Sequence, residues 1–365
     1  MKRRTFLGSG VAAGAGLGAA VVAAPAIAQD RPEVSWRLAS SYPKSLDTIY
    51  GGVELIARRV AEATDGRFTI RPYAAGEIVP PLQVLDAVQN NTVECGQSAA
   101  YFYVGKDPAF AFDTALPFGL TTRQHLAWEI HGGGLELIRA FLKDYNVTLI
   151  PAGNTGAQMG GWFRKEIQTV DDLKGLKMRI GGLAGQVMSR LGLVPQQIGG
   201  GDIYPALERG TIDAAEFVGP YDDEKLGFYK VAKYYYYPGW WEGAAQIPLL
   251  INLDAWQALP ASYRTVLEQA CAEANTWMLA KYDALNAAAL KRLVAGGAIL
   301  KPFPRAVLEA CHEEAFRIYD EIAAKNPRFK TLYESWKPFR DEEYLWFRVA
   351  ENSFESFVYS VQRRG

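Results

Sequence analysis

Histidine and cysteine are scarce in this chain, with three of each among 365 residues. Zinc sites are built from clusters of these residues, and the three cysteines form no CxxC pair, so a zinc centre is not expected. Acid–base catalysis by histidine is disfavoured for the same reason. The formal net charge of −1 provides no field for binding phosphates, so nucleic acid is not an expected partner. Charged residues interrupt the apolar runs after the N-terminal segment, which argues against a membrane span there.

The cysteines leave two alternatives open. Cys95, Cys271 and Cys311 are an odd set for an oxidising compartment. Cys271 and Cys311 both lie in helical patterns, where buried free thiols or a Cys271–Cys311 disulfide would each fit.

The N-terminus has the pattern of an export signal. Arg3 and Arg4 precede a stretch rich in alanine, glycine and valine that ends in the small-residue motif of residues 26–28. This pattern predicts a signal peptide over residues 1–28, cleaved before Gln29, and the arginine pair is typical of the twin-arginine route. An uncleaved anchor is the alternative, although glycine and alanine span a bilayer poorly. We therefore expect an exported protein of the periplasm.

Hydrophobic patterns alternate between strand and helix periods up to about residue 255. Strands are predicted near residues 34–39, 67–73, 147–150, 176–180 and 214–218, and helices near residues 53–61, 82–88, 126–142, 184–191 and 203–208. This βαβα order predicts an α/β fold with mostly parallel sheets in two halves and helices on both faces. Ligands of such sheets bind beyond the carboxyl ends of the strands.

Long helices follow. The patterns of residues 261–293 and 306–324 are nearly unbroken, and residues 339–361 form a helix rich in aromatic residues. So aromatic a helix is expected to bury most of its circumference, either across both halves or against a second copy of the chain.

The sequence contains no complete enzyme motif. The run from His131 to Gly134 resembles an esterase oxyanion loop, but the best nucleophile elbow, around Ser98, precedes it, whereas esterases have the opposite order. A helix end followed by a glycine turn is the alternative for His131. There is no Walker motif and no EF-hand loop. An enzyme is not predicted.

Polar residues after predicted strands are the candidates for a binding site. Residues 154–163 follow a strand, and their glycines would let a ligand approach the backbone closely. Arg179 lies near the end of an apolar strand, where its guanidinium suits either a carboxylate of the protein or one on a ligand. Glu216 closes another apolar strand, and a structural salt bridge is its alternative role.

Five segments resemble the extracytoplasmic solute receptors of TRAP (tripartite ATP-independent periplasmic) transporters. They are residues 38–47 (LASSYPKSLD), 160–165 (GGWFRK), 199–208 (GGGDIYPALE), 216–223 (EFVGPYDD) and 234–243 (YYYYPGWWEG). The last segment is similar to the alpha-keto-acid-binding branch, and the similarity runs from the signal to the C-terminus.

This resemblance implies a two-lobed periplasmic-binding-protein fold with long connecting and C-terminal helices. Lobe I would contain residues 29–152 plus about 241–275, and lobe II would contain residues 153–240 plus about 276–335. Residues 336–365 would form a C-terminal helix that packs across the lobes or against a partner subunit.

The resemblance also implies the residues of the site. Arg179 would clamp the ligand carboxylate, with Tyr101 and Asn154 at further pocket positions. A cation would bridge ligand and protein through Gln158, Glu216, the main-chain carbonyl of Phe217 and Glu242. The branch carries tryptophan where this chain has Phe217, which preserves a carbonyl ligand but changes the pocket width. Oxygen ligands alone suit Na⁺ or Ca²⁺ and not zinc.

The expected function is capture of a 2-oxo monocarboxylate such as pyruvate, together with Na⁺ (alternatively Ca²⁺), for delivery to the membrane permease subunits of a TRAP transporter. A calcium-dependent receptor for a 2-hydroxy acid such as lactate is the alternative. A homodimer through the C-terminal helix is a further expectation.

Overall fold

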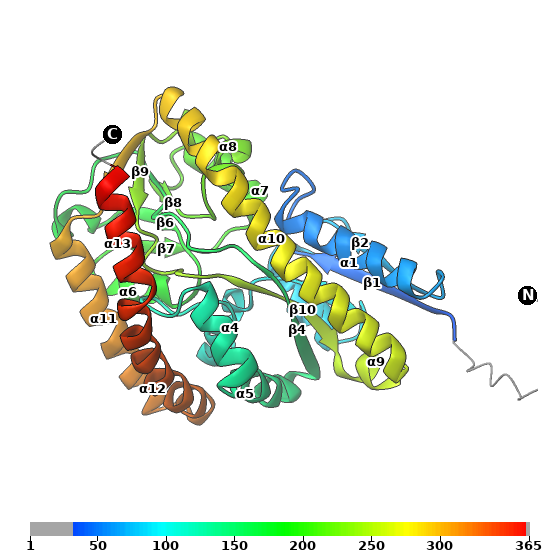
Figure 1. Cartoon of the computed structure of the whole chain (residues 1–365). Helices are drawn as coiled ribbons and strands as arrows, with labels where there is room; N and C mark the ends of the chain where they lie inside the picture. Colours follow the sequence, from blue (N-terminus) through cyan, green and yellow to red (C-terminus); the bar gives the residue numbers. More distant parts are fainter. Residues whose placement is uncertain (1–31, 363–365) are drawn as a thin grey trace, which may run out of the picture. The chain divides into compact units, whose positions relative to one another are not determined.

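The computed structural model describes residues 32–362 (Figure 1). Its strands are β1 (Val34–Ser40), β2 (Phe68–Tyr73), β3 (Cys95–Gln97), β4 (Val147–Asn154), β5 (Trp162–Phe163), β6 (Lys177–Arg179), β7 (Val194–Gln196), β8 (Ala214–Ala215), β9 (Tyr234–Tyr237), β10 (Gln246–Asn252) and β11 (Ile299–Pro302). Its α-helices are α1 (Ile49–Ala63), α2 (Val84–Gln89), α3 (Ala111–Thr114), α4 (Thr122–His131), α5 (Gly134–Leu142), α6 (Gly182–Arg190), α7 (Gly200–Glu208), α8 (Pro220–Leu226), α9 (Leu253–Ala258), α10 (Ala261–Ala295), α11 (Arg305–Ala323), α12 (Pro327–Val349) and α13 (Glu351–Gln362). The 3-10 helices are η1 (Pro81–Gln83), η2 (Ala100–Tyr103), η3 (Pro108–Phe110), η4 (Lys143–Tyr145), η5 (Val170–Leu173) and η6 (Phe228–Lys230).

The first sheet has five strands in the order β2-β1-β3-β10-β4. Alternate side chains of its strands enter two different cores. Ile150 and Leu249 pack with α1 and α10 on one face, whereas Leu149 and Leu250 pack with α2 and α5 on the other. Helices therefore cover both faces, as predicted.

The second sheet has six strands in the order β11-β9-β5-β8-β6-β7. Phe163, Ala214 and Met178 pack on the face covered by α6 and α11, and Trp162 and Ala215 pack on the face covered by α7, α8 and α10. The two sheets confirm the α/β class and the two-lobed arrangement. The residue boundaries of the lobes stay a prediction.

The prediction of mostly parallel sheets is only partly right. Strand β10 is antiparallel to both β3 and β4, and β5 is antiparallel to both β8 and β9. β10 follows β9 of the second sheet directly in the chain and enters the first sheet from there, a crossing that periodicity within one strand cannot reveal.

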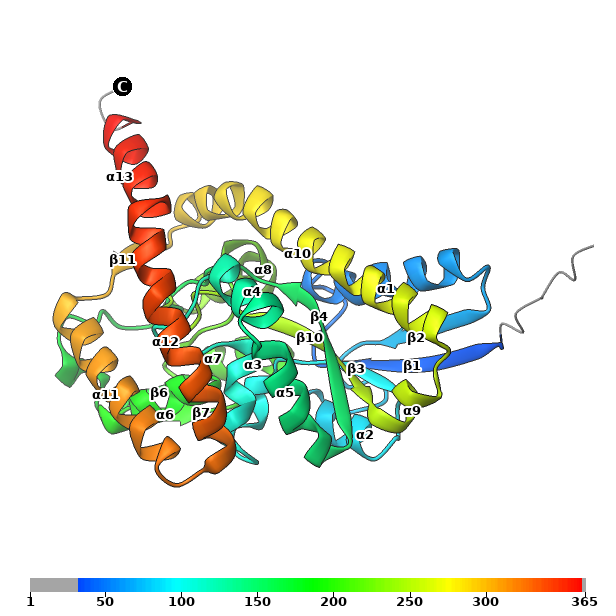
Figure 2. The same cartoon turned by 60° about the horizontal axis from the view of Figure 1, so that its bottom comes forward.

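Helix α10 connects the two halves. Its 35 residues pack against α1 and β4 of the first half and against α8 of the second, and Figures 1 and 2 show it running across both. The predicted helix over residues 261–293 is confirmed. The helix predicted over residues 126–142 is instead two helices, α4 and α5, separated at Gly133, whose φ of +80° ends helical geometry. His131 thus ends a helix before a glycine turn.

The C-terminal aromatic segment differs from its prediction. It forms two helices, α12 and α13, and in Figure 2 α13 projects beyond the rest of the chain. Trp346, Phe354 and Phe357 are 59%, 68% and 68% exposed. The expectation that this segment buries most of its circumference is wrong for a single chain, because the body of the protein ends before α13 does.

The remaining expectations concern the thiols and the membrane. Cys95, Cys271 and Cys311 are buried free thiols, so the alternative of a Cys271–Cys311 disulfide is wrong.

Between residues 32 and 362, none of the helices combines the length and the hydropathy needed to cross a bilayer. The predicted signal peptide lies outside the described residues.

Candidate functional site

Arg179 and Glu216 come from neighbouring strands. β6 and β8 are parallel, with Arg179 in register with Ala215, so their carboxyl ends bring Arg179 and Glu216 to one edge of the sheet. Nη1 of Arg179 donates to the main-chain oxygen of Glu216 at 2.9 Å and forms an ion pair with Oε1 of the same residue. The amide of Gly181 donates to that Oε1 at 3.2 Å, and both side chains of the ion pair are buried. The structure thus gives Arg179 a carboxylate of the protein as partner.

Aromatic rings surround the guanidinium of Arg179. Its Cζ lies 5.5 Å from the ring centroid of Phe217 and 5.9 Å from that of Phe102, distances suited to cation–π contacts. A Cβ on Gly181 would lie 2.3 Å from Cε2 of Tyr101, so glycine is required beside this ring in the turn between β6 and α6. Rings from the first half of the chain therefore close over an arginine from the second.

A small cavity lies beside Arg179. It is lined by Tyr42, Ile49, Tyr101, Phe102, Thr155, Gln158, Arg179, Phe217, Val218, Ala245 and Ile247. Its volume of about 10 Å³ gives room for roughly one water molecule. The segments that carry its lining come from both halves of the chain, so a larger ligand requires the two halves to separate before it enters.

Three buried oxygens of the predicted cation ligands lack hydrogen-bond partners: Oε1 of Gln158, Oε2 of Glu216 and Oε2 of Glu242. Gln158 lines the cavity, whereas Glu216 and Glu242 are not among its lining residues. Nε2 of Gln158 donates to Oγ1 of Thr155 at 3.0 Å, and the Gln158 amide donates to the Glu242 carbonyl at 3.0 Å. Buried acceptors usually have partners, and a hard cation would satisfy acceptors of this kind. These residues therefore fit the Na⁺ or Ca²⁺ that the family resemblance implies.

The candidate donors of the site are oxygen atoms. In the part of the chain that the structure describes, no group of three or more histidine, cysteine, aspartate or glutamate residues is arranged to hold a metal ion. A cation at this site would rely on two carboxylates together with amide and main-chain oxygens, which suits hard cations.

Burial dominates the electrostatics of the site. It raises the pKa of Glu242 well above its usual range, and the nearby Glu216 raises that pKa further, against the effects of Tyr101, Arg179 and Gln158. Burial also raises the pKa of Glu216, which Arg179 opposes. Burial alone would lower the pKa of Arg179, but Glu216 holds it above its ordinary value. Two neighbouring buried carboxyl groups are costly to ionise, and a bound cation would reduce this cost.

Asn154 is not among the cavity-lining residues. Its Oδ1 accepts hydrogen bonds from Oγ1 of Thr122 and from the Gly156 amide, each at 2.9 Å. Its Nδ2 donates to Oε1 of Gln246 at 3.1 Å. These hydrogen bonds hold the loop that follows β4 in place. Contact between Asn154 and a ligand remains a prediction from the family resemblance.

Two glycines of residues 154–163 lie against other parts of the chain. A Cβ on Gly160 would lie 2.4 Å from the Phe303 ring, and one on Gly161 would lie 2.6 Å from the carbonyl oxygen of Ala215. At Gly160 and Gly161 the prediction that a ligand approaches the backbone is wrong, because Phe303 and the carbonyl of Ala215 occupy that space. At Gly156 it stays a prediction.

Sequence reasoning missed several lining residues. Tyr42 and Ile49 flank the turn after β1, and Val218 follows β8, so their position after strands was an available signal. Ala245 and Ile247 lie at the start of β10, a strand that was not predicted.

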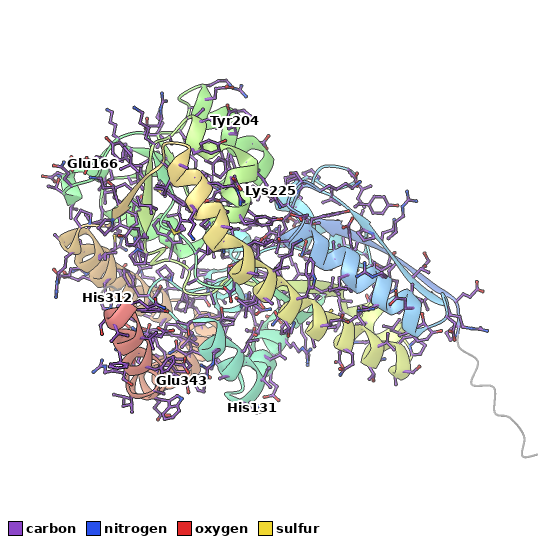
Figure 3. All side chains as sticks on the ribbon, turned by 45° about the horizontal axis from the view of Figure 1, so that its top comes forward. His131, Glu166, Tyr204, Lys225, His312 and Glu343 are labelled. Carbon is purple, nitrogen blue, oxygen red and sulfur yellow. The ribbon has the colours of Figure 1, made fainter. Side chains whose placement is uncertain are left out.

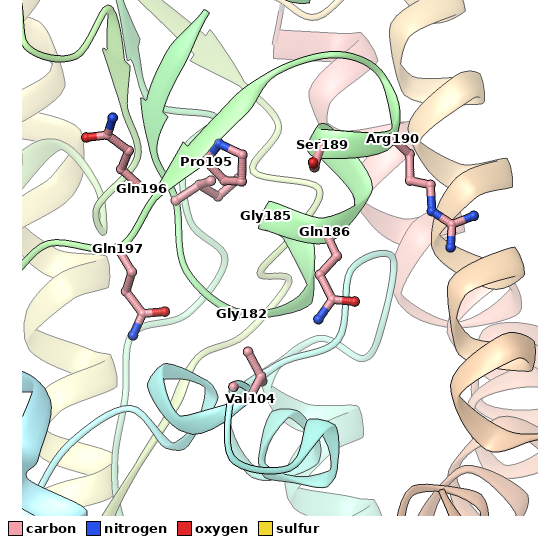
Figure 4. Close-up of a pocket in the computed structure, with 11 residues that line it drawn as sticks. Val104, Gly182, Gly185, Gln186, Ser189, Arg190, Pro195, Gln196 and Gln197 are labelled. Carbon is pink, nitrogen blue, oxygen red and sulfur yellow. The ribbon is translucent and has the colours of Figure 1, made fainter. Parts of the chain in front are cut away.

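A larger groove of about 550 Å³ lies beyond Gly182, with Gln186, Gln196 and Gln197 on its walls (Figure 4). Its charged residue, Arg190, donates to both carboxylate oxygens of Glu321, at 3.1 and 2.6 Å. This arginine is already paired at the surface, so the smaller cavity is the better candidate for binding an acid.

Residues 39–326 match the family model of the bacterial extracellular solute-binding proteins, family 7. A monocarboxylate 2-oxoacid-binding periplasmic protein of Nostoc sp. is 56% identical over 331 residues, which cover 91% of each chain.

Two crystal structures are also similar. A TRAP transporter solute-binding protein from Bordetella bronchiseptica, a dimer with calcium and picolinate in one site and none in the other, has a TM-score of 0.90 at 53% identity, covering 91% of this chain and 99% of that one. A TRAP periplasmic solute-binding protein from Pseudoalteromonas atlantica, with sodium and pyruvate bound, has a TM-score of 0.86 at 37% identity, covering 89% and 99%.

Receptors of this kind are transport components and not enzymes, and they work with membrane permease subunits. From its family match, its identity to these relatives and its fold, the chain belongs to the DctP family of TRAP-transporter solute-binding proteins.

Proposed function

We propose that the protein captures a 2-oxo monocarboxylate of the pyruvate class together with Na⁺ and delivers it to the permease subunits of a TRAP transporter. The observation that carries this proposal is the buried Arg179 beside the unpartnered oxygens of Gln158, Glu216 and Glu242. A 2-oxo acid offers a carboxylate to an arginine and an adjacent carbonyl oxygen to a cation. The Nostoc and Pseudoalteromonas relatives support this choice of ligand.

Each residue has a role in this proposal. Arg179 binds the carboxylate as a planar fork. Gln158, Glu216, Glu242 and the carbonyl of Phe217 hold the cation. Tyr101 closes the cavity over the acid, and Asn154 holds the loop that carries Gln158.

A calcium-dependent receptor for a 2-hydroxy acid such as lactate is the second candidate. A 2-hydroxyl oxygen reaches a cation from the same position as a 2-oxo oxygen. The calcium in the Bordetella relative and the two carboxylates of the site favour this candidate, because Ca²⁺ prefers several oxygen ligands.

Calorimetric titration tests both candidates. The protein is stripped of ligand and cations and titrated with pyruvate or lactate, alone or with Na⁺ or Ca²⁺. The proposal expects pyruvate to bind tightest and to bind tighter with Na⁺. Tighter binding of lactate in Ca²⁺ would select the second candidate, and no binding of either acid would refute both.

We also propose export through the twin-arginine route, which rests on Arg3 and Arg4 of the predicted signal. Replacement of both arginines by lysine is expected to retain the precursor in the cytoplasm. Normal export of that variant in cell fractionation would refute this route.

Finally, we propose that the protein is a homodimer joined through α13 and the end of α12. Leu345, Trp346, Val349, Phe354 and Phe357 are 59–70% exposed on these helices. Exposed apolar side chains concentrated on one terminal segment favour an interaction site, and the dimer of the Bordetella relative supports a second copy as the partner.

A further inference from the structure

Asp47 joins the two halves of the chain. It lies in the turn between β1 and α1, and its carboxylate forms an ion pair with Nζ of Lys225 on α8. Nζ of Lys281, on α10, donates to Oδ2 of Asp47 at 2.9 Å and to its main-chain oxygen at 2.8 Å. The hydroxyl of Tyr221, also on α8, donates to Oδ2 at 3.2 Å. Figure 3 shows Lys225 where the second half borders the first.

In each half of the chain, residues that line the cavity are close in sequence to residues of this cluster. The turn that carries Asp47 also carries Tyr42 and Ile49, which line the cavity from the first half. Phe217 and Val218, which line it from the second half, immediately precede α8. Separation of Asp47 from α8 would therefore also separate these two walls.

Asp47 lies between two lysine side chains that are mostly buried. The side chains of Lys225 and Lys281 are 25% and 22% exposed, so both ammonium groups are partly desolvated. Burial lowers the pKa of Lys225, and the positive charge of the nearby Lys281 lowers it further, to about 8. Without the carboxylate between them, two neighbouring positive charges would repel each other.

We propose that Asp47, Lys225, Lys281 and Tyr221 form an electrostatic latch that holds the two walls of the cavity together and slows release of the bound acid without touching it. Asp47 is a positioning residue in this latch. The part that concerns release rests on the proposed function, whereas the closure of the walls does not.

The test uses Asp47→Asn in the full mature chain, with Asp86→Asn as a matched control. Asp86 pairs with Lys106 at 2.6 Å, and both residues lie in the first half of the chain, so this pair does not cross between the sheets. Hydrogen–deuterium exchange of the ligand-free protein reports wall closure. Stopped-flow fluorescence reports release of pyruvate in the presence of Na⁺.

We expect Asp47→Asn to increase exchange in residues 42–49 and 217–226 and to speed pyruvate release by about two- to five-fold, with little change in the association rate. High salt should reduce the difference from the wild type, because the side chain of Asp47 is 51% exposed to solvent. Lys225→Met should give a similar effect, and combining it with Asp47→Asn should add little.

Unchanged exchange in both segments of Asp47→Asn, or an equal increase in Asp86→Asn, would overturn the latch. Failure of the wild type to bind pyruvate would refute the proposed function instead, and the exchange measurement would still decide whether the latch exists.

Discussion

Arg179 and Glu216 form a buried ion pair at the carboxyl ends of the adjacent strands β6 and β8. The pair uses one carboxylate oxygen of Glu216, and the other oxygen has no partner. The proposed ligand clamp and the proposed cation ligand therefore lie side by side. In that proposal, a ligand carboxylate would bring negative charge to Arg179 and a cation would bring positive charge to Glu216.

Substitution of Arg179 by lysine should weaken pyruvate binding by about ten- to a hundred-fold, because the charge remains but the planar fork is lost. Isothermal titration of both proteins in Na⁺ buffer measures the change. Arg190→Lys, at the surface, is the control and should bind as the wild type does. Near-native affinity of Arg179→Lys would leave Arg179 as a structural partner of Glu216 only.

Substitution of Glu216 by glutamine should weaken cation binding and remove much of the coupling between cation and acid. Coupling is reciprocal, so in the wild type Na⁺ and pyruvate should each tighten the other by the same factor. The measurement is pyruvate titration with and without Na⁺ on wild type, Glu216→Gln and Glu242→Gln. If Na⁺ leaves the affinity for pyruvate unchanged in all three proteins, no cation takes part and Glu216 is a salt-bridge residue.

The buried Asp223 should make the protein less stable as pH rises from about 4 to about 7. Burial raises its pKa to about 7, against hydrogen bonds from Tyr235 at 2.7 Å and from Trp162 at 3.0 Å. Between these pH values the unfolded state binds fewer protons than the folded state, so the free energy of unfolding falls by up to about 1.4 kcal/mol per pH unit for this group.

Asp223→Asn keeps an oxygen that can accept both hydrogen bonds and removes the titration. Urea unfolding at several pH values should therefore give a shallower decline for this variant than for the wild type. Asp65→Asn, at an exposed position, is the control and should follow the wild-type profile. A decline of equal slope in all three proteins would show that Asp223 ionises as freely in the folded chain as in the unfolded one.

Charges placed on α13 should separate the proposed dimer. Phe354→Glu combined with Phe357→Glu removes two exposed aromatic side chains and adds repulsion between copies. Sedimentation velocity should show a dimer for the wild type and a monomer for the variant, with pyruvate affinity retained. A wild type that sediments as a monomer at micromolar concentration would contradict the proposal.

Local patterns in the sequence determined the individual elements. The nearly unbroken helical pattern of residues 261–293, which contains no glycine or proline, matched the extent of α10 closely, because helix formation depends on neighbours within one segment. The apolar strands that end at Arg179 and near Glu216 placed both residues at strand ends, where ligands of α/β sheets bind.

Contacts between distant segments were decided only by the tertiary structure. Whether Arg179 faced a protein carboxylate stayed open in the sequence, since the answer depends on β6 lying next to β8. Tyr42 and Val218 line one cavity although they are far apart in the chain, and α8 contacts the turn that carries Asp47. The space around Gly160 is filled by Phe303, which is far away in the chain. The partner of Arg179, the closure of the cavity walls and the space around Gly160 all depend on which surfaces meet after folding. The local hydrophobic pattern of one segment contains no information about such contacts.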